Sequence, residues 1–128
     1  MDAWEKALSD AVGQHSPLFR PPFGFRRPDT LRVAARRGLT TVMWSASGND
    51  WKLPTAEAIE RQVARHVRGG DVILLHDGGY RQMGVDRAAT VAATERLIGR
   101  YKGEGYGFVT VPEMMSHRGG AEARSSTG

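Results

Sequence analysis

Strand-like runs alternate with segments of helical periodicity along this chain, and this alternation limits the fold more than any other feature. The successive segments are 2–12 (helix), 17–20 (extended), 29–37 (helix), 39–45 (strand), 55–68 (helix), 72–76 (strand), 87–102 (helix) and 107–111 (strand). Because helices that connect successive strands form βα units, the order predicts an α/β fold with a mostly parallel sheet.

Local signals support several of these segments. Ile59, Val63 and Val67 repeat at i, i+4 and i+8, which predicts the buried stripe of the helix at 55–68. Thr55 is expected to be the N-cap of that helix, and Asp29 is expected to cap the helix at 29–37. The run at 72–76 is continuously apolar, which favours a strand buried on both faces.

Length and composition exclude several classes of protein. The chain has 128 residues, which fits one domain or part of a larger one, and no apolar run reaches the length of a membrane span. It has no cysteine, so disulfides, thiolate nucleophiles and cysteine-based zinc sites are excluded. The segment 116–128 is polar and rich in glycine and serine, and we expect it to be a disordered tail. The first residues show no signal-peptide pattern, so either the protein is intracellular or its native start lies elsewhere.

The charge of the chain is only mildly basic. The formal net charge is +4, with six arginines between Arg20 and Arg37. Nucleic-acid binding would need such a cluster within a known binding module, and no module pattern is present, so we expect no nucleic-acid partner. Arg32, Arg36 and Arg37 fit a solvated helix face, although a basic rim would also suit an anionic polymer.

Chemistry in parallel sheets gathers at the carboxyl ends of the strands. Here those ends are the segments 20–24, 45–51 and 76–77. His76 could donate a proton to a leaving group, and Asp50 is the carboxylate that could orient it. Arg20 is a fixed cation that could hold a carboxylate. The Pro-Pro-Phe-Gly turn that follows it could present a rigid backbone N–H to an oxyanion.

Each of these residues also has a purely structural interpretation. A histidine at a strand end is often a hydrogen-bonded structural residue. Trp51 on its own fits packing better than a platform for substrate, and Asp50 on its own fits a turn. Residue types and positions therefore leave both interpretations open.

Four segments together resemble a known family, the polysaccharide deacetylases (the NodB-homology family, carbohydrate esterase family four). Leu-Phe-Arg-Pro-Pro-Phe-Gly at 18–24 resembles the third family motif. Asn-Asp-Trp at 49–51 resembles the fourth, and Ile-Leu-Leu-His-Asp at 73–77 resembles the fifth. The segment 105–114 is similar to the last strand and closing helix of the family. The resemblance covers residues 3–115 in the family's order.

This resemblance implies a distorted (β/α) barrel and a hydrolase of N-acetyl, sometimes O-acetyl, groups on chitin-like oligomers, peptidoglycan or xylan. The family uses a divalent metal, commonly zinc, held by one aspartate and two histidines, and a second aspartate as general base. By position, Arg20 would hold that base and Phe23 would give its backbone N–H to the oxyanion. Asp50 would tune His76, the acid that protonates the leaving amine.

The resemblance also implies a groove for the substrate. Trp51 and Leu74 would line the groove that receives the acetyl methyl group. A non-catalytic half-domain that keeps this groove and binds a glycan or a partner is the alternative.

Two family motifs are missing. The first, Thr-Phe-Asp-Asp-Gly, carries the base and one metal ligand, and the second, His-x-x-x-His, carries the other two ligands; neither occurs in the sequence. A smaller departure is Ser47, where many members have another aspartate. We therefore expect residues 1–115 to be the C-terminal part of a deacetylase domain, with no metal in this chain and no activity alone. The open sheet edges would favour self-association or pairing with an N-terminal half. The family often acts at the cell envelope or outside the cell, so localisation stays open.

Overall fold

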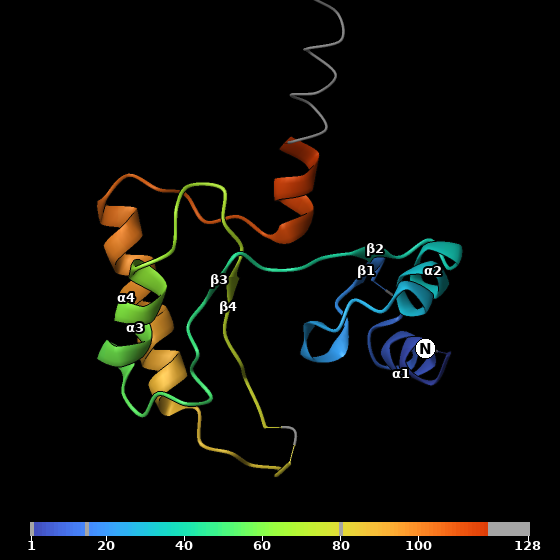
Figure 1. Cartoon of the computed structure of the whole chain (residues 1–128), viewed down its shortest axis with the longest axis horizontal. Coiled ribbons are helices and arrows are strands. Elements are labelled where there is room, and N and C mark those ends of the chain that lie inside the picture. The colour runs from blue at the N-terminus through green and yellow to red at the C-terminus, as the bar shows by residue number, and fades with distance from the viewer. Residues whose placement is uncertain (1, 15, 80, 118–128) are drawn as a thin grey trace, which may run out of the picture. The chain divides into compact units, whose positions relative to one another are not determined.

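A computed structural model describes residues 2–14, 16–79 and 81–117 (Figure 1). The chain divides into two compact units, Met1–Met43 and Trp44–Gly128, and each unit is described by itself. No helix in the described part of the chain is long and apolar enough to span a membrane.

The first unit contains two helices and a pair of parallel strands. Its elements are α1 (Asp2–Val12), β1 (Leu18–Phe19), the 3₁₀ turn η1 (Pro22–Gly24), α2 (Pro28–Arg36) and β2 (Thr40–Thr41). Strand β1 pairs with β2 in parallel, with Leu18 opposite Thr40. Helix α2 packs against β2 and buries Ala34 completely. The expected helix, extended stretch, helix and strand therefore follow in the expected order.

The N-cap expected at Asp29 is wrong. Helix α2 starts one residue earlier, with Arg27 at the N-cap position and Pro28 in the first turn. Proline is favoured there because its fixed φ suits the helix and its missing N–H removes an unpaired donor. Asp29 instead lies in the first turn, near the positive end of the helix, and pairs with Arg32 at 3.2 Å.

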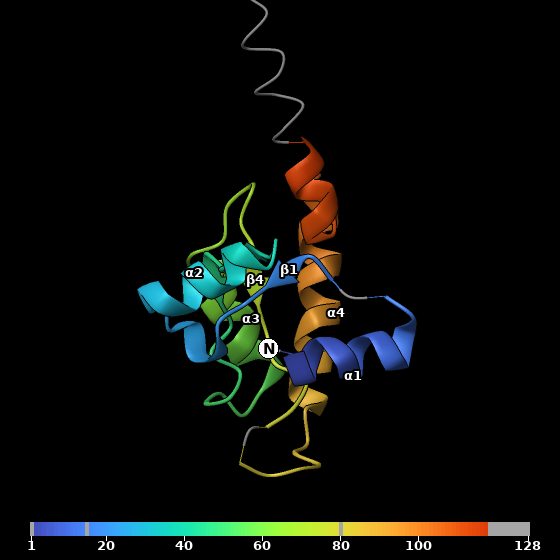
Figure 2. The same cartoon turned by 90° about the vertical axis from the view of Figure 1, so that its right-hand side faces the viewer.

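The second unit contains the other pair of strands and α4, the longest described helix (Figures 1 and 2). Its elements are β3 (Ala46–Ser47), α3 (Ala56–Ala64), β4 (Ile73–Leu74), α4 (Ala88–Gly103) and a final helix at 111–117. Strand β3 pairs with β4 in parallel, with Ala46 opposite Ile73 and Ser47 opposite Leu74. Both strand pairs in the described residues are parallel, as the order of segments predicts.

The core of the second unit lies between α3, α4 and β3. Ile59 and Val63 on α3 are fully buried, and they face α4, which buries Ala93 and Leu97. The expected apolar stripe is confirmed at these two α3 positions. Thr55 is confirmed as the N-cap, because its hydroxyl accepts the N–H of the third residue of α3 at 3.2 Å. The helix ends at Ala64, short of the expected residue 68.

The strands are shorter than the sequence predicts. The strand expected at 39–45 forms only at Thr40–Thr41, as β2 in the first unit, and β3 in the second unit begins at residue 46, just beyond the expected range. The run at 72–76 pairs only at Ile73 and Leu74, and its residues are half-buried rather than buried on both faces. The expected strand at 107–111 is absent, because no described strand lies beside it to accept its backbone hydrogen bonds.

The end of the described chain is more ordered than expected. The helix at 111–117 includes two residues of the predicted tail, and residues 118–128 lie outside the described residues. A capping box starts this helix: Glu113 accepts the backbone N–H of Thr110 at 2.7 Å, and the Thr110 hydroxyl accepts the N–H of Glu113 at 3.4 Å.

Candidate active site

The loops that follow β3 and β4 bring Asp50 and His76 together. The parallel register places the carboxyl ends of both strands at one edge, so the two loops leave the sheet side by side. Asp50 lies three residues after β3, and His76 lies two residues after β4. The pairing of β3 with β4 thus brings together two side chains that are 26 residues apart in the sequence.

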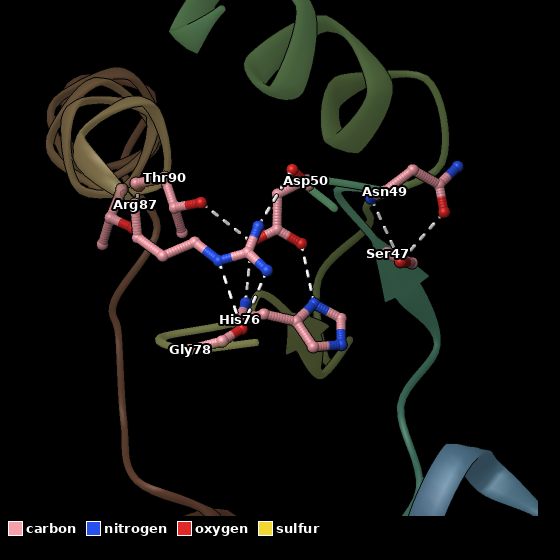
Figure 3. Close-up of polar contacts among 8 residues, drawn as sticks. Ser47, Asn49, Asp50, His76, Gly78, Arg87 and Thr90 are labelled. Carbon is pink, nitrogen blue, oxygen red and sulfur yellow. Dashed lines mark hydrogen bonds and ion pairs between the residues drawn. The ribbon is translucent and has the colours of Figure 1, made fainter. Parts of the chain in front are cut away.

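Asp50 binds His76 through both carboxylate oxygens (Figure 3). Oδ1 lies 2.8 Å from the ring atom Nδ1, and Oδ2 accepts the backbone N–H of His76 at 2.7 Å. Thr90 on α4 donates its hydroxyl to Oδ2 at 2.9 Å. The carboxylate therefore fixes both the backbone and the ring of His76.

The Asp50 carboxylate is buried but stays charged. Its residue is 4% exposed. Burial by itself would raise the pKa of Asp50, but the hydrogen bonds from the His76 ring, the His76 backbone and Thr90 outweigh burial and lower the pKa below its ordinary value. An ionised carboxylate accepts hydrogen bonds only, so it selects the form of His76 with a proton on Nδ1.

The His76 ring is held on one side and open on the other. The side chain is 39% exposed, whereas that of Asp50 is 0% exposed. Because Nδ1 faces Asp50, Nε2 is the ring atom that can exchange a proton with a substrate. Trp51 meets the ring edge-on, with centroids 5.4 Å apart, and is itself half exposed. A partly exposed imidazole, held by a buried carboxylate, thus lies beside an exposed indole.

Leu74 is the last residue of β4 and is half-buried, two residues before His76. The next residue, Leu75, lies against the interior of the second unit: a Cβ added at Gly48 would come within 2.5 Å of Leu75 Cδ2 and 3.1 Å of Ile59 Cγ2.

Helix α4 supplies two residues that the sequence did not identify. Thr90 binds the carboxylate of Asp50, and Arg87, at the N-cap position of α4, donates to backbone oxygens of Asp50 and Gly78. A cavity of about 320 Å³ beside Asp50 is lined in part by Trp51, Arg87 and Thr90. No local pattern marks these residues, because both lie about 40 positions from Asp50 in a segment with ordinary helical composition.

The sequence and structure of the chain are similar to known deacetylases over most of its length, although no protein-family model matches it. It is 39% identical over 103 residues to a peptidoglycan-N-acetylglucosamine deacetylase of Bacillus cereus, covering 79% of this chain and 46% of that protein. It is 37% identical over 99 residues to a chitooligosaccharide deacetylase of Sinorhizobium fredii, covering 73% of this chain and 46% of that protein.

A solved structure agrees with these relatives. The family 4 carbohydrate esterase of Streptomyces lividans, in complex with acetate, matches with a TM-score of 0.66 and 33% identity, over 83% of this chain and 52% of that one. The chain is homologous to the polysaccharide deacetylases of carbohydrate esterase family 4. It spans about half the length of the curated relatives it matches.

The segment 18–24, which resembles the third deacetylase motif, lies in the first unit and contains the short turn η1. Arg20 donates from Nε to the backbone oxygen of Val42 at 3.1 Å, and from Nη2 to that of Met43 at 3.4 Å. Phe23, in η1, has a left-handed backbone with φ of +54°, and its side chain is 68% exposed. The turn that carries the expected oxyanion donor thus contains a strained, left-handed residue.

The residues present do not fit the deacetylase metal. In the described ranges, no group of three histidine, aspartate or glutamate side chains could hold a metal ion. Asp50 is the buried carboxylate of the site, and both of its oxygens bind His76 or Thr90. Any metal chemistry of a deacetylase would therefore need ligands from outside the described residues.

Proposed function

We propose that this chain carries the proton-donating part of a glycan deacetylase site. In its complete form, the protein would hydrolyse N-acetyl, or O-acetyl, groups of cell-wall or chitin-like glycans. The observation that carries the proposal is the buried Asp50 carboxylate bound to a half-exposed His76 at 2.8 Å. The deacetylases named above support the substrate class, and such a substrate would place the complete protein at the cell envelope or outside the cell.

The proposed role of His76 follows from the reaction. Hydrolysis of an N-acetyl group adds a water oxygen to the carbonyl carbon and breaks the C–N bond. The departing amine then needs a proton. His76 would donate that proton from Nε2, while Asp50 holds Nδ1 and balances the charge of the protonated ring.

Trp51 and Leu74 would form the wall of the glycan groove. Trp51 is half exposed beside His76, and an exposed indole offers an apolar face that a sugar ring can contact. Leu74, two residues before His76, would contact the acetyl methyl group from β4.

Arg20 and Phe23 would have their own roles in the complete protein. Arg20 would hold the carboxylate of the general base, and the backbone N–H of Phe23 would donate to the oxyanion. The left-handed turn at Phe23 supports this role, because a strained, fixed backbone suits a donor that must be positioned in advance.

The isolated chain would lack both the base and the metal. We propose that residues 1–115 form a partial (β/α) barrel, the C-terminal part of a deacetylase domain. The rest of that domain would supply the general base and the metal. Without an activated water, His76 is an acid with no reaction to complete, so the chain alone would be inactive.

A second candidate function is binding without catalysis, to a glycan or to a partner protein. Trp51 supports the first, and the segment 106–110 supports the second. Phe108 and Val109 in that segment are 44% and 57% exposed, and no described strand pairs with it. Such an edge could pair with an N-terminal half or with a second copy.

A fusion protein tests the catalytic proposal. The part of the Bacillus cereus relative that this chain does not match would be joined to the chain, and acetate release from chitin oligomers and peptidoglycan would be measured with and without zinc. We expect zinc-dependent release by the fusion and none by the chain alone. His76→Ala should lower kcat by about 10²–10⁴-fold.

Two outcomes would count against this proposal. Zinc-dependent acetate release by the isolated chain would show that it needs no other part. A fusion that folds, binds zinc and is unaffected by His76→Ala would remove His76 as the acid. A separate result would favour the binding function. The chain would be retained on chitin beads, Trp51→Ala would abolish this retention, and the fusion would release no acetate.

A further inference from the structure

We propose that Arg87 is a positioning residue that ties the loop after β3 to the loop after β4 and so sets the geometry of Asp50 and His76. The geometric part of this inference stands on the structure alone, and only its consequence for proton transfer rests on the proposed function.

The guanidinium of Arg87 binds both loops at once (Figure 3). Nη2 and Nε donate to the backbone oxygen of Gly78 at 2.8 Å and 3.2 Å. Nη1 donates to the backbone oxygen of Asp50 at 3.4 Å. Gly78 is two residues after His76, so one side chain links the backbone beside the acid to the backbone that carries its carboxylate.

The sheet itself does not hold these loops. Strands β3 and β4 pair only at two positions each, Ala46–Ser47 and Ile73–Leu74, and the next backbone bond joins the N–H of Gly48 to the oxygen of Leu74 at 3.1 Å. Beyond that point, the loops are joined in the described residues by the hydrogen bonds of the Asp50 carboxylate to His76, by those of Arg87, and by the edge-on contact of the Trp51 and His76 rings.

Helix α4 provides the fixed base for this link. Arg87 is at the N-cap position, the side chain of Asp86 accepts the N–H of Ala88 at 2.8 Å, and α4 packs against α3 in the core. Thr90, in the first turn of the same helix, holds the carboxylate of Asp50 at 2.9 Å. The start of α4 thus fixes Asp50 at two points, the carboxylate through Thr90 and the backbone through Arg87.

Arginine is suited to this role because its guanidinium is a planar fork with several donors in fixed directions. Two of them converge on one oxygen while a third reaches the other loop. A lysine has a single ammonium on a flexible stem and cannot reproduce that arrangement.

The test measures the tautomer of His76 directly, in the full chain labelled with ¹⁵N-histidine. NMR correlations through the ring distinguish a proton on Nδ1 from one on Nε2. In the unmodified chain we expect the neutral ring of His76 to carry its proton on Nδ1, facing Asp50. In Arg87→Ala we expect the loss of this single form and the appearance of both tautomers, with Arg87→Lys restoring it only in part.

Arg100→Ala is the matched control, because Arg100 lies on the same helix and pairs with Glu60 rather than with the loops. It should leave the His76 signals unchanged. Circular dichroism and the His66 signals show whether a variant has unfolded. If Arg87→Ala unfolds, Arg87→Gln replaces it in the comparison, because glutamine keeps a shorter hydrogen-bonding side chain.

A folded Arg87→Ala or Arg87→Gln variant whose His76 tautomer equals that of the unmodified chain would overturn the inference. The measurement needs no turnover, so an inactive fusion protein would contradict the proposed function and leave this result intact. In a fusion that is active, Arg87→Ala should lower kcat with little change in KM, because the groove wall at Trp51 is retained.

Discussion

A single buried carboxylate organises the candidate site at the scale of individual residues. Asp50 accepts hydrogen bonds from the ring and backbone of His76 and from Thr90. These are charge-assisted bonds in a water-poor position, which are stronger than neutral ones. The geometry of His76 therefore depends on the charge of Asp50.

The stability of the chain should depend on this charge. The pKa of Asp50 is lower in the folded chain than in the unfolded chain, so ionised Asp50 stabilises the fold above its unfolded pKa of about 4. That contribution is lost as the pH falls through the lower, folded pKa. We expect Asp50→Asn to lose about 1–3 kcal/mol in the free energy of unfolding at pH 7, measured with urea.

The variant should also lose part of its acid sensitivity. Between pH 5 and pH 2, the free energy of unfolding of Asp50→Asn should fall less steeply than that of the unmodified chain. Asp77→Asn, which changes an exposed carboxylate next to His76, is the control and should keep the original slope. Equal slopes for all three proteins would show that Asp50 is not ionised preferentially in the folded state.

Thr90 offers a second test at this scale. Thr90→Val keeps the shape of the side chain but removes the hydroxyl that donates to Asp50, so we expect a loss of about 1–2 kcal/mol. Thr90→Ser keeps the donor and should be clearly more stable than Thr90→Val in the same urea titration. If the two variants unfold at the same denaturant concentration, the hydroxyl contributes nothing.

At the scale of elements, Gly48 sets how closely β3 approaches the core. A Cβ at this position would come within 2.5 Å of Leu75 Cδ2 and 3.1 Å of Ile59 Cγ2, and Ile59 is fully buried on α3. The strand therefore lies against α3 only because residue 48 has no side chain.

Gly48→Ala should consequently lower the free energy of unfolding by about 1–3 kcal/mol, the usual cost of overfilling a packed core. Gly99→Ala is its control, because Gly99 lies within α4 and a Cβ there meets nothing within 4 Å. We expect Gly99→Ala to stabilise the chain by about 0.5–1 kcal/mol through helix propensity. Thermal unfolding of both variants checks this prediction. Melting temperatures that shift in the same direction would contradict it.

At the scale of the whole molecule, the segment 106–110 presents exposed apolar side chains and pairs with no strand in the described residues. Phe108 and Val109 in this segment are 44% and 57% exposed. Exposed apolar strand edges favour association between chains.

We therefore expect the isolated chain to associate as its concentration rises, measured by analytical ultracentrifugation. Val109→Lys should weaken the association by at least about tenfold, because a charge on an edge strand opposes pairing. Val12→Lys on α1, which is 60% exposed in the first unit, should not change it. A chain that stays monomeric at high concentration would argue against an open edge at 106–110.

The sequence by itself determined the features that depend on near neighbours. The helices, the Thr55 cap and the buried pair Ile59 and Val63 follow from spacing and residue type within a few positions. The motifs at 49–51 and 73–77 also marked Asp50 and His76 one by one as candidate site residues. Hydrogen bonds within one helical turn or one motif are encoded locally, so a local pattern can predict them.

Only the tertiary structure decided the features that depend on distant segments. Asp50 stays charged although it is buried because the ring and backbone of His76, 26 residues away, and Thr90 on α4, 40 residues away, donate hydrogen bonds to its carboxylate. The strand expected at 107–111 failed to form because pairing needs a neighbour, which no property of its own residues supplies. The path of the whole chain sets which residues are buried, which strands pair and which distant side chains meet. The local sequence does not specify this path.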